Sequence, residues 1–228
     1  IKKLSFTEEK EVVKKGAKWA VENGFGYRED LDYIEENGVM EGADPLLVSD
    51  RAYERGRDQV GTLGSGNHFV EIDIVDEIYE PEIANVFGLY KDNIAVLFHT
   101  GSRGFGYQVC DDYLQSSLSA CQKYGIELPD RELAAAPLSS EEGQNYLKAM
   151  SAAANFAFAN RQLITHWVRE VFGRHFGARD LPLLYDVCHN IAKFEEIPRG
   201  NETLKVCVHR KGATRAYPPG HPLIPEKY

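Results

Sequence analysis

The order of strand-like and helix-like segments restricts the possible folds of this chain more than any other feature. Four runs have strand character, at residues 67–74, 93–99, 182–188 and 203–209. A helical face at residues 107–121 lies between the second and third runs, and a long alanine-rich helical segment extends from Glu141 to about Phe176. Because strands and helices mix without regular alternation, the sequence predicts an α+β fold.

The N-terminal part predicts one amphipathic helix followed by a connector. Ser5 and Glu8 have the spacing of a capping box, and apolar residues then repeat at helical spacing until Asn23-Gly24 ends the run. Residues 25–60 are polar and acidic, with glycine and proline breaks and a possible short helix near residues 52–57. We therefore expect a surface connector here.

The composition argues against several classes of protein. A net charge of −9 disfavours general coating of nucleic acids, since such proteins are usually basic, but it permits a local basic site. No apolar run approaches the length of a membrane span and no secretory signal is visible, so we expect a cytoplasmic protein with no membrane partner. The cysteines form no C-x-x-C pair and lie in apolar runs, which predicts reduced core thiols at Cys110, Cys121, Cys188 and Cys207.

A glycine-rich segment leads into the first strand-like run and carries several candidate site residues. If the strand begins at Asn67, then Asn67, Phe69 and Glu71 share one face and His68 lies on the other, because strand side chains alternate. An amide, a ring and a carboxylate in a row suit a planar polar ligand such as a nucleobase, and the imidazole suits a metal. The alternative is a tight turn beside a hydrogen-bonded histidine.

Three histidines stand where a loop meets a strand-like run: His68, His99 and His189. If they converge in space, their imidazole nitrogens suit zinc, manganese, iron or copper. Ordinary hydrogen bonding by each ring is the alternative. Two further histidines, His166 and His175, lie nine residues apart on the long helical segment, on roughly opposite faces, and are not expected to share a metal.

Cationic side chains also lie at loop ends. Arg103 follows the second glycine-rich loop, just ahead of a helix, where amide groups help to hold an anion. Arg210, Lys211 and Arg215 follow the last strand-like run and suit phosphate oxygens, although a solvated basic turn is the alternative. The sequence has no Walker A motif, dinucleotide fingerprint or G-x-S-x-G elbow, which favours metal-assisted phosphoryl or nucleotidyl transfer.

Four long segments carry these candidates: Gly61–Glu71, His99–Gly104, Asp186–Lys193 and His209–Gly220. In this order they resemble the motifs of the RtcB family of RNA ligases, which act in tRNA splicing and RNA repair. The resemblance covers most of residues 50–220 and implies mixed sheets with flanking helices in a single domain.

The resemblance also implies a reaction that depends on GTP and manganese. RNA ends with a 3′-phosphate or 2′,3′-cyclic phosphate, such as tRNA halves, would be activated by GMP and joined to 5′-hydroxyl ends. An accessory protein factor is a further expected partner. By the motif match, the manganese ligands would be His68, His99 and His189, the residues at the guanine nucleotide would be Asn67, Phe69 and Glu71, and those at RNA or nucleotide phosphates would be Arg103, Asn190, Lys211 and Arg215.

Two family motifs do not occur in the sequence. One is an Asp-x-x-Cys motif whose thiolate bridges two metals, and the other is a His-Gly-Ala-Gly-Arg motif whose histidine carries GMP. We therefore expect residues 1–228 to be the central part of an RtcB-like catalytic domain, with no catalytic nucleophile in this chain and no ligation by it alone. A His-metal phosphoesterase and a non-catalytic module that binds RNA ends are the alternatives.

Overall fold

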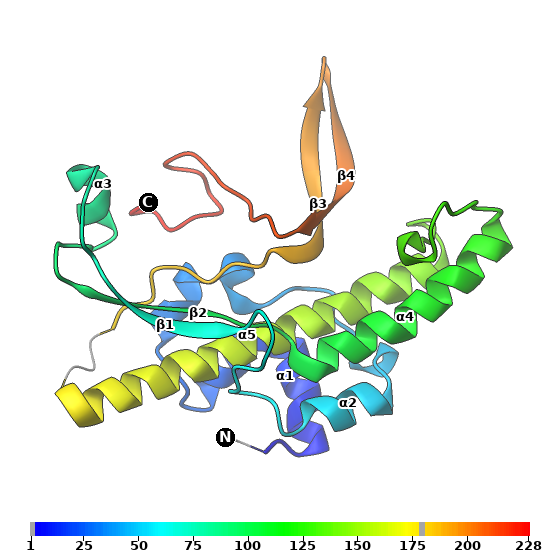
Figure 1. Ribbon diagram of the computed structural model, residues 1–228. Helices are drawn as coiled ribbons and strands as arrows, with labels where there is room; N and C mark the ends of the chain where they lie inside the picture. The colour runs from blue at the N-terminus through cyan, green and yellow to red at the C-terminus, as the bar shows by residue number, and fades with distance from the viewer. Residues whose placement is uncertain (1–2, 178–180) are drawn as a thin grey trace.

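The longest helix, α5 (Glu141–Phe176), is the element against which the other long helices pack (Figure 1). The computed structural model describes residues 3–177 and 181–228. Ser140 caps the start of α5 by accepting the Gly143 amide, and Gly177 ends it in the left-handed conformation. Both α4 (Arg103–Tyr124) and α1 (Phe6–Glu22) pack along α5.

The other elements are short. The remaining α-helices are α2 (Asp50–Gly56) and α3 (Pro81–Val86). The 3-10 helices are η1 (Arg28–Tyr33), η2 (Glu35–Gly38), η3 (Pro45–Leu47) and η4 (Arg131–Leu133). The strands are β1 (Phe69–Ile74), β2 (Ile94–His99), β3 (Asn190–Arg199) and β4 (Glu202–Lys211).

The main core lies among α1, α2, α4 and α5. The alanines of α5 permit close approach of its neighbours, because the distance between packed helices depends on the side chains at the contact. Phe156 of α5 stacks on Phe105 of α4 with ring centroids 4.8 Å apart, and Tyr53 of α2 meets Phe105 edge-on. These rings join three helices into one packed unit.

A kink in α1 is stabilised by a buried amide of α5. Gly16 has φ 54°, so the regular helix is interrupted there, and a Cβ at this position would overlap the Gly38 carbonyl oxygen. The Asn155 amide donates to the Val13 carbonyl at 2.9 Å and its oxygen accepts the Met40 amide at 2.7 Å. The predicted capping box at Ser5 and the helix end near Asn23 are confirmed.

Two separate two-stranded antiparallel sheets complete the α+β fold, and this predicted fold class is confirmed. In the first sheet β1 pairs with β2, with Phe69 opposite His99. In the second, β3 and β4 form a hairpin that stands away from the helices (Figure 1). The strand predicted at 93–99 is confirmed as β2. Its continuous apolar run is typical of a buried strand, but this expectation is wrong, since Ile94 and Leu97 are exposed.

The strand predicted at residues 182–188 is wrong. Within the described residues this segment is irregular and makes only an isolated parallel bridge, between Asp186 and Ile34. A continuous apolar run cannot distinguish a strand from an extended segment that packs on a helix. The strand predicted at 203–209 is confirmed within β4, but its partner β3 was not predicted.

The predicted surface connector, residues 25–60, is also wrong. The short helix expected near residues 52–57 is confirmed as α2, but the segment also contains three 3-10 helices and buries Asp30, Ile34 and Tyr53. Polar composition misled here because a buried carboxylate is stable when it is paired: Asp30 receives two hydrogen bonds, of 2.6 and 2.7 Å, from Arg169 of α5.

The cysteines are only partly as predicted. All four are free thiols in the part of the chain that the structure describes, but only Cys121 lies in the core and Cys110 is exposed. None of the described helices combines the length and the apolar character that a crossing of the membrane requires.

Candidate metal and phosphate site

The three histidines singled out in the sequence lie close together at the ends of the two sheets. His99 is the last residue of β2, His68 directly precedes β1, and His189 directly precedes β3. The ring centroid of His99 lies 5.8 Å from that of His68 and 4.9 Å from that of His189. The Nε2 atoms of His99 and His189 face each other at 2.8 Å.

A backbone carbonyl orients the central ring. His99 Nδ1 lies 2.8 Å from the carbonyl oxygen of Asn67, which can only accept, so Nδ1 carries the proton. In the neutral ring Nε2 then has a free lone pair directed at His189. A carbonyl partner of this kind is the usual support of a metal-binding histidine, because it fixes the tautomer and the ring direction.

The surroundings of the outer two rings favour the neutral form of each imidazole. Partial burial lowers the pKa of His68, and the positive charge of Arg103 and the neighbouring His99 add to the effect. Burial likewise lowers the pKa of His189, together with His99, Arg161 and Lys211. Neutral imidazole is the form that binds metals, so the electrostatics of the cluster suit a cation ligand set.

The imidazole nitrogens of the cluster are donors that transition metals bind, and the rings of His99 and His189 are also placed so that both could bind one ion. Two nitrogens bound at about 2.1 Å to one tetrahedral metal lie roughly 3.4 Å apart, so His99 and His189 need to part only slightly. His68 is held differently. Its Nδ1 lies 3.1 Å from Arg103 Nη1, which can only donate, so this lone pair is directed at a guanidinium. Among residues 3–177 and 181–228 no three His, Cys, Asp or Glu side chains are grouped closely enough to enclose an ion.

Arg103 brings a positive charge to the histidines. It is the first residue of α4, has φ 56°, and its Nε donates to Thr62 Oγ1 at 3.2 Å. The approach of Arg103 requires a glycine opposite, since a Cβ on Gly64 would overlap both Arg103 and His68. Gly64 itself has φ 108°, which side chains rarely adopt.

The candidate nucleotide residues adjoin the same cluster. Strand β1 begins at Phe69, two residues later than expected. Asn67 therefore lies in the preceding turn and His68 between that turn and the strand, so strand alternation does not place His68 on the opposite face. Because Phe69 pairs with His99, their side chains share a face, with ring centroids 5.6 Å apart. Glu71 lies two residues further along β1 on that face and is exposed, as are Asn67 and Phe69.

The cationic residues at the end of β4 and in the loop after it have different surroundings from one another. Lys211, paired with Asn190, is exposed at the end of the β3–β4 ladder, and the Asn190 side chain accepts the Gly212 amide at 3.0 Å. Arg210 forms two hydrogen bonds with Glu195. Lys211 is therefore the residue of this loop best placed for an incoming phosphate.

Arg215 is held instead by carboxylates that the sequence reasoning missed. It donates to Glu35 at 2.7 and 3.0 Å and to Glu36 at 2.7 Å, and only 11% of its side chain is exposed. Buried Lys193 lies 2.8 Å from the same two carboxylates. Burial raises the pKa values of Glu35 and Glu36, but the two cations outweigh it and hold both below the usual value.

This carboxylate pair also reaches the histidine cluster. Glu35 Oε2 accepts the amide of Cys188, which directly precedes His189, at 2.8 Å. Glu36 has φ 57°, a strained conformation for a residue with a side chain. The Glu-Glu-Asn-Gly turn was the only local signal in the sequence, and it did not indicate what the carboxylates bind.

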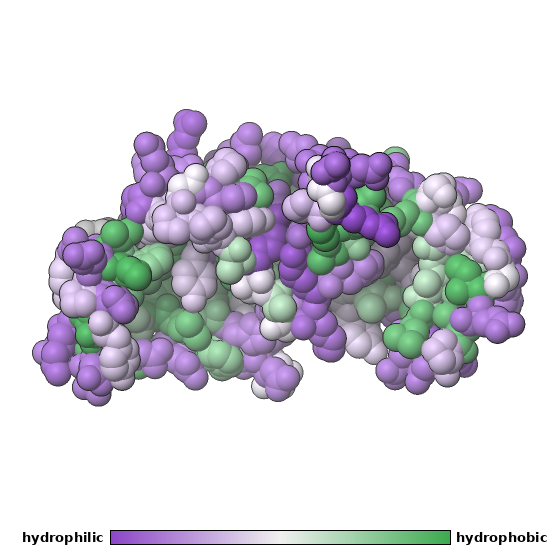
Figure 2. Space-filling model, turned by 90° about the horizontal axis from the view of Figure 1, so that it is seen from above, coloured by the Kyte–Doolittle hydropathy of each residue, from purple (hydrophilic) through white to green (hydrophobic). Residues whose placement is uncertain are grey.

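A cavity of about 990 Å³ opens beside the cluster, and its lining includes His68, His99, His189 and Arg103. Apolar residues of β2, α4, α5 and the segment 181–188 form most of its other walls. Seen from above, hydrophobic residues lie in hollows of the surface between hydrophilic rims (Figure 2). The cluster thus combines cationic and imidazole groups with a largely apolar hollow, as ligand sites commonly do.

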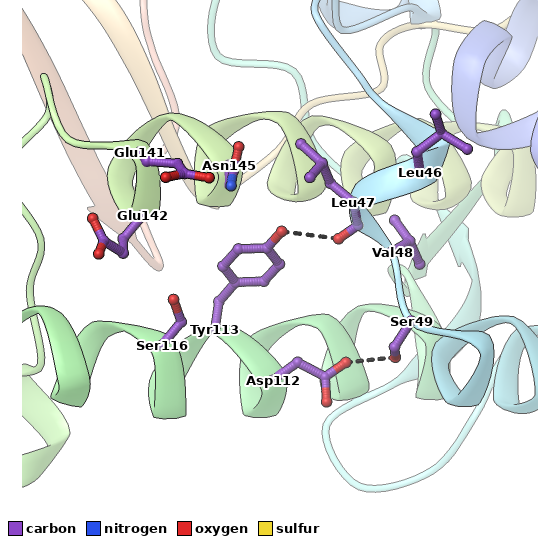
Figure 3. A pocket seen from close by; sticks show the side chains of 10 residues that line it. All are labelled: Leu46, Leu47, Val48, Ser49, Asp112, Tyr113, Ser116, Glu141, Glu142 and Asn145. Carbon is purple, nitrogen blue, oxygen red and sulfur yellow. Dashed lines mark hydrogen bonds between the residues drawn. The ribbon is translucent and has the colours of Figure 1, made fainter.

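A second cavity, of about 600 Å³, lies between α4, α5 and η3 (Figure 3). Its charged lining is acidic, with Asp112, Glu141 and Glu142. Asp112 accepts the Ser49 hydroxyl at 2.6 Å, and the Tyr113 hydroxyl donates to the Leu47 carbonyl at 2.9 Å. Carboxylates repel phosphates, so the histidine cavity is the better candidate for a phosphate ligand.

Comparison with known proteins identifies one family for the whole chain. Residues 1–228 match the family described as "tRNA-splicing ligase RtcB". Proteins with the same description are similar to this chain over 99% of its length: one from Thermococcus kodakarensis is 54% identical, one from Pyrococcus abyssi 56%, and one from Archaeoglobus fulgidus 51%. The chain covers 48%, 25% and 48% of these relatives, respectively, and so spans about half of their length or less.

Proposed function

Because this chain belongs to the RtcB family, we propose that the protein containing it is a GTP- and manganese-dependent RNA ligase. Its substrates would be RNA ends with a 3′-phosphate or 2′,3′-cyclic phosphate, joined to 5′-hydroxyl ends through activation with GMP. The proposal concerns the whole protein, since the chain spans about half of its relatives or less.

One observation carries the proposal: two imidazoles with facing Nε2 atoms stand next to a third histidine and an arginine. We propose that His68, His99 and His189 are manganese ligands. A manganese ion held there would polarise a phosphate oxygen and offset its charge. His99, already oriented by the Asn67 carbonyl, would bind through Nε2, and His68 would exchange Arg103 for the metal.

The release of Arg103 from His68 would serve a second purpose. A guanidinium freed from an imidazole can form two parallel hydrogen bonds with a phosphate. Lys211 is exposed at the neighbouring strand end and would add a second positive charge. We propose that Arg103, Asn190 and Lys211 hold RNA or nucleotide phosphates, and that Arg215 contributes by fixing the loop that carries Lys211.

The exposed face of β1 supports a nucleotide role. Phe69 offers a ring face next to His99, and Glu71 on the same strand face offers a carboxylate that can accept amino or imino protons of a guanine. We propose that Asn67, Phe69 and Glu71 contact the guanine nucleotide. Since Phe69 and His99 are paired, a nucleotide at this face would reach the metal with its phosphates.

We further propose that tRNA halves are the natural RNA substrate, that an accessory protein factor takes part, and that the protein acts in the cytoplasm. The name of the relatives refers to tRNA splicing, which supports the first of these points. The cationic residues near the cavity support recognition of RNA ends despite a net charge of −9.

The test is a ligation assay with the full-length protein. RNA with a 3′-phosphate and RNA with a 5′-hydroxyl are incubated with GTP and Mn²⁺, and joined product is expected. His99→Ala is expected to abolish joining and to lower bound manganese, while His175→Ala, on the exposed end of α5, serves as the matched control. Release of phosphate in the absence of GTP, without joined product, would refute the ligase and favour a metal-dependent phosphoesterase.

A further inference from the structure

Two adjacent residues of α5, Asn160 and Arg161, contact the backbone segments that carry the histidines. They lie in the middle of the helix, and their exposed fractions are 0% and 8%. Neighbouring residues of a helix point about 100° apart, so one pair can reach segments on different sides. Neither residue stands out in the sequence, where this helix is notable only for its alanines.

Asn160 joins the two glycine-rich loops. Its side-chain oxygen accepts the amides of Gly61 and Thr62 at 2.7 and 3.0 Å. Its amide nitrogen donates to the carbonyls of Thr62 and Gly101 at 3.1 and 3.0 Å. Asn160 therefore fixes the loop before His68 to the loop directly after His99.

Arg161 joins the end of β2 to the segment before β3. Its guanidinium donates to Asp186 at 2.6 Å and to the Thr100 carbonyl at 3.3 Å, and it lies 3.8 Å from the Cys188 sulfur. Thr100 directly follows His99, and Cys188 directly precedes His189. One guanidinium thus contacts the chain neighbours of both rings whose Nε2 atoms face each other.

We propose that Asn160 and Arg161 are positioning residues that set the relative places of the three histidines. Both side chains are buried and bonded on several sides. A change in Asn160 therefore moves the loop that ends two residues after His99, and a change in Arg161 moves the Thr100 carbonyl next to His99 and the Cys188 side chain next to His189. This inference deepens the proposed function, because the histidines are the metal ligands proposed there. Supporting contacts of this kind commonly change metal affinity when they are removed.

The same helix supplies a matched control. Arg169 is also buried, with 4% exposed, and like Arg161 it bonds a buried carboxylate and a backbone carbonyl: Asp30, and Leu181 at 2.9 Å. The contacts of Arg169 involve no residue adjacent to a histidine of the cluster. If buried arginines of α5 act only through stability, substitution at either position has the same consequence.

The experiment compares Arg161→Lys with Arg169→Lys in the full-length protein. Lysine keeps the positive charge beside each carboxylate, but its single ammonium cannot bridge all the partners of the guanidinium. Manganese affinity is measured by calorimetry, and the tautomers of the histidine rings are measured without metal by long-range ¹H–¹⁵N spectra. Thermal unfolding is recorded for both variants.

Arg161→Lys is expected to weaken manganese binding about 10- to 100-fold and to shift the His99 and His189 ring signals, while Arg169→Lys changes the affinity less than about threefold. Asn160→Asp, which keeps the side-chain shape but loses both amide donors, is expected to behave like Arg161→Lys and serves if that variant does not fold. Unchanged ring signals in the Arg161 and Asn160 variants, or equal loss of affinity in both arginine variants, would overturn the inference.

The two proposals can fail separately. If the unsubstituted protein binds manganese but joins no RNA, the ligase proposal fails and the affinity comparison still decides the positioning role. If it binds no manganese, the metal assignment fails, and the ring spectra of the metal-free variants decide whether Asn160 and Arg161 position the histidines.

Discussion

Replacing Glu9 with glutamine is expected to stabilise the protein at neutral and alkaline pH and to have little effect in mild acid. Glu9 lies on α1 with 0% of the residue exposed, and neither of its carboxylate oxygens has a hydrogen-bond partner among the described residues. The nearest cation, Arg57, places its Nε 3.7 Å from Oε2. A buried carboxylate with no hydrogen bond and only a long ion-pair contact is costly when it is charged.

The size of the effect follows from the pKa. Burial raises the pKa of Glu9 from 4.5 to about 7, opposed by Arg57 and helped by the negative charge of Asp58. At about 1.4 kcal/mol for each tenfold change in proton affinity, this corresponds to about 3 kcal/mol. Below pH 4.5 both folded and unfolded chains hold the proton, so this contribution to the free energy of unfolding is fully present.

Between pH 4.5 and about 7 the unfolded chain loses the proton and the folded chain retains it, so stability falls as the pH rises. Above pH 7 the folded protein holds a buried charge that Arg57 only partly compensates. Glutamine has nearly the same shape and never carries that charge. The difference in free energy of unfolding between Glu9→Gln and the unsubstituted protein should therefore grow from near zero at pH 4.5 to about 3 kcal/mol at pH 8.

Urea denaturation at a series of pH values measures this difference, and a ¹³C titration of the Glu9 carboxyl measures its pKa directly. Glu11→Gln is the control, since Glu11 is 40% exposed and pairs with Lys15 on the surface of the same helix. The Glu11 variant is expected to change stability by less than about 1 kcal/mol at every pH. A Glu9 carboxyl that titrates near pH 4.5, or a stability difference independent of pH, would refute the reasoning.

Three further predictions concern the histidine site. Gly64→Ala introduces both backbone strain and overlap with His68 and Arg103. Gly66→Ala introduces only strain, since Gly66 has φ 73° and open space around its Cβ. Manganese titration should show a loss of affinity at least about tenfold greater for Gly64→Ala than for Gly66→Ala. Lys211→Ala should weaken the binding of 3′-phosphate RNA in a filter assay and reduce the salt dependence of that binding. Lys205→Ala, on the exposed β3–β4 hairpin, is the control. An equal loss of RNA affinity in both variants would show a general charge effect. Arg215→Ala leaves Glu35 and Glu36 with Lys193 alone and should lower the free energy of unfolding by about 2 kcal/mol in urea denaturation. An unchanged free energy of unfolding would show that the contacts of Arg215 with the two carboxylates do not stabilise the fold.

Much of the local structure followed from the sequence. The capping box at Ser5, the helix from Glu141 to Phe176 and the strand after Asn67 were found because each is specified by residues close together in the chain. Errors arose where burial, not local pattern, decided the outcome. Segment 182–188 has the apolar run of a strand but packs as an irregular segment. Within the polar connector Asp30 is buried, because Arg169 neutralises it.

The candidate site was predictable in its residues but not in its interactions. The three histidines were identified by residue type and by their places at strand ends, and their roles as manganese ligands stay a prediction. The contact of Arg103 with His68 was not predicted, and Arg215 was expected at a phosphate whereas it is bonded to Glu35 and Glu36. A basic side chain in a loop looks the same in a sequence whether it faces solvent or a buried carboxylate.

By itself the sequence determined the long helices, most of the strands, the α+β class and the set of candidate residues, but not α3 or the 3-10 helices. Only the tertiary structure decided that His99 and His189, 90 residues apart in the chain, face each other at 2.8 Å. It also decided that Asn160 and Arg161 connect the loops that carry the cluster. The physical reason is that helical and strand periodicity depends on neighbours within a few residues, whereas these contacts depend on how a buried helix packs against distant segments.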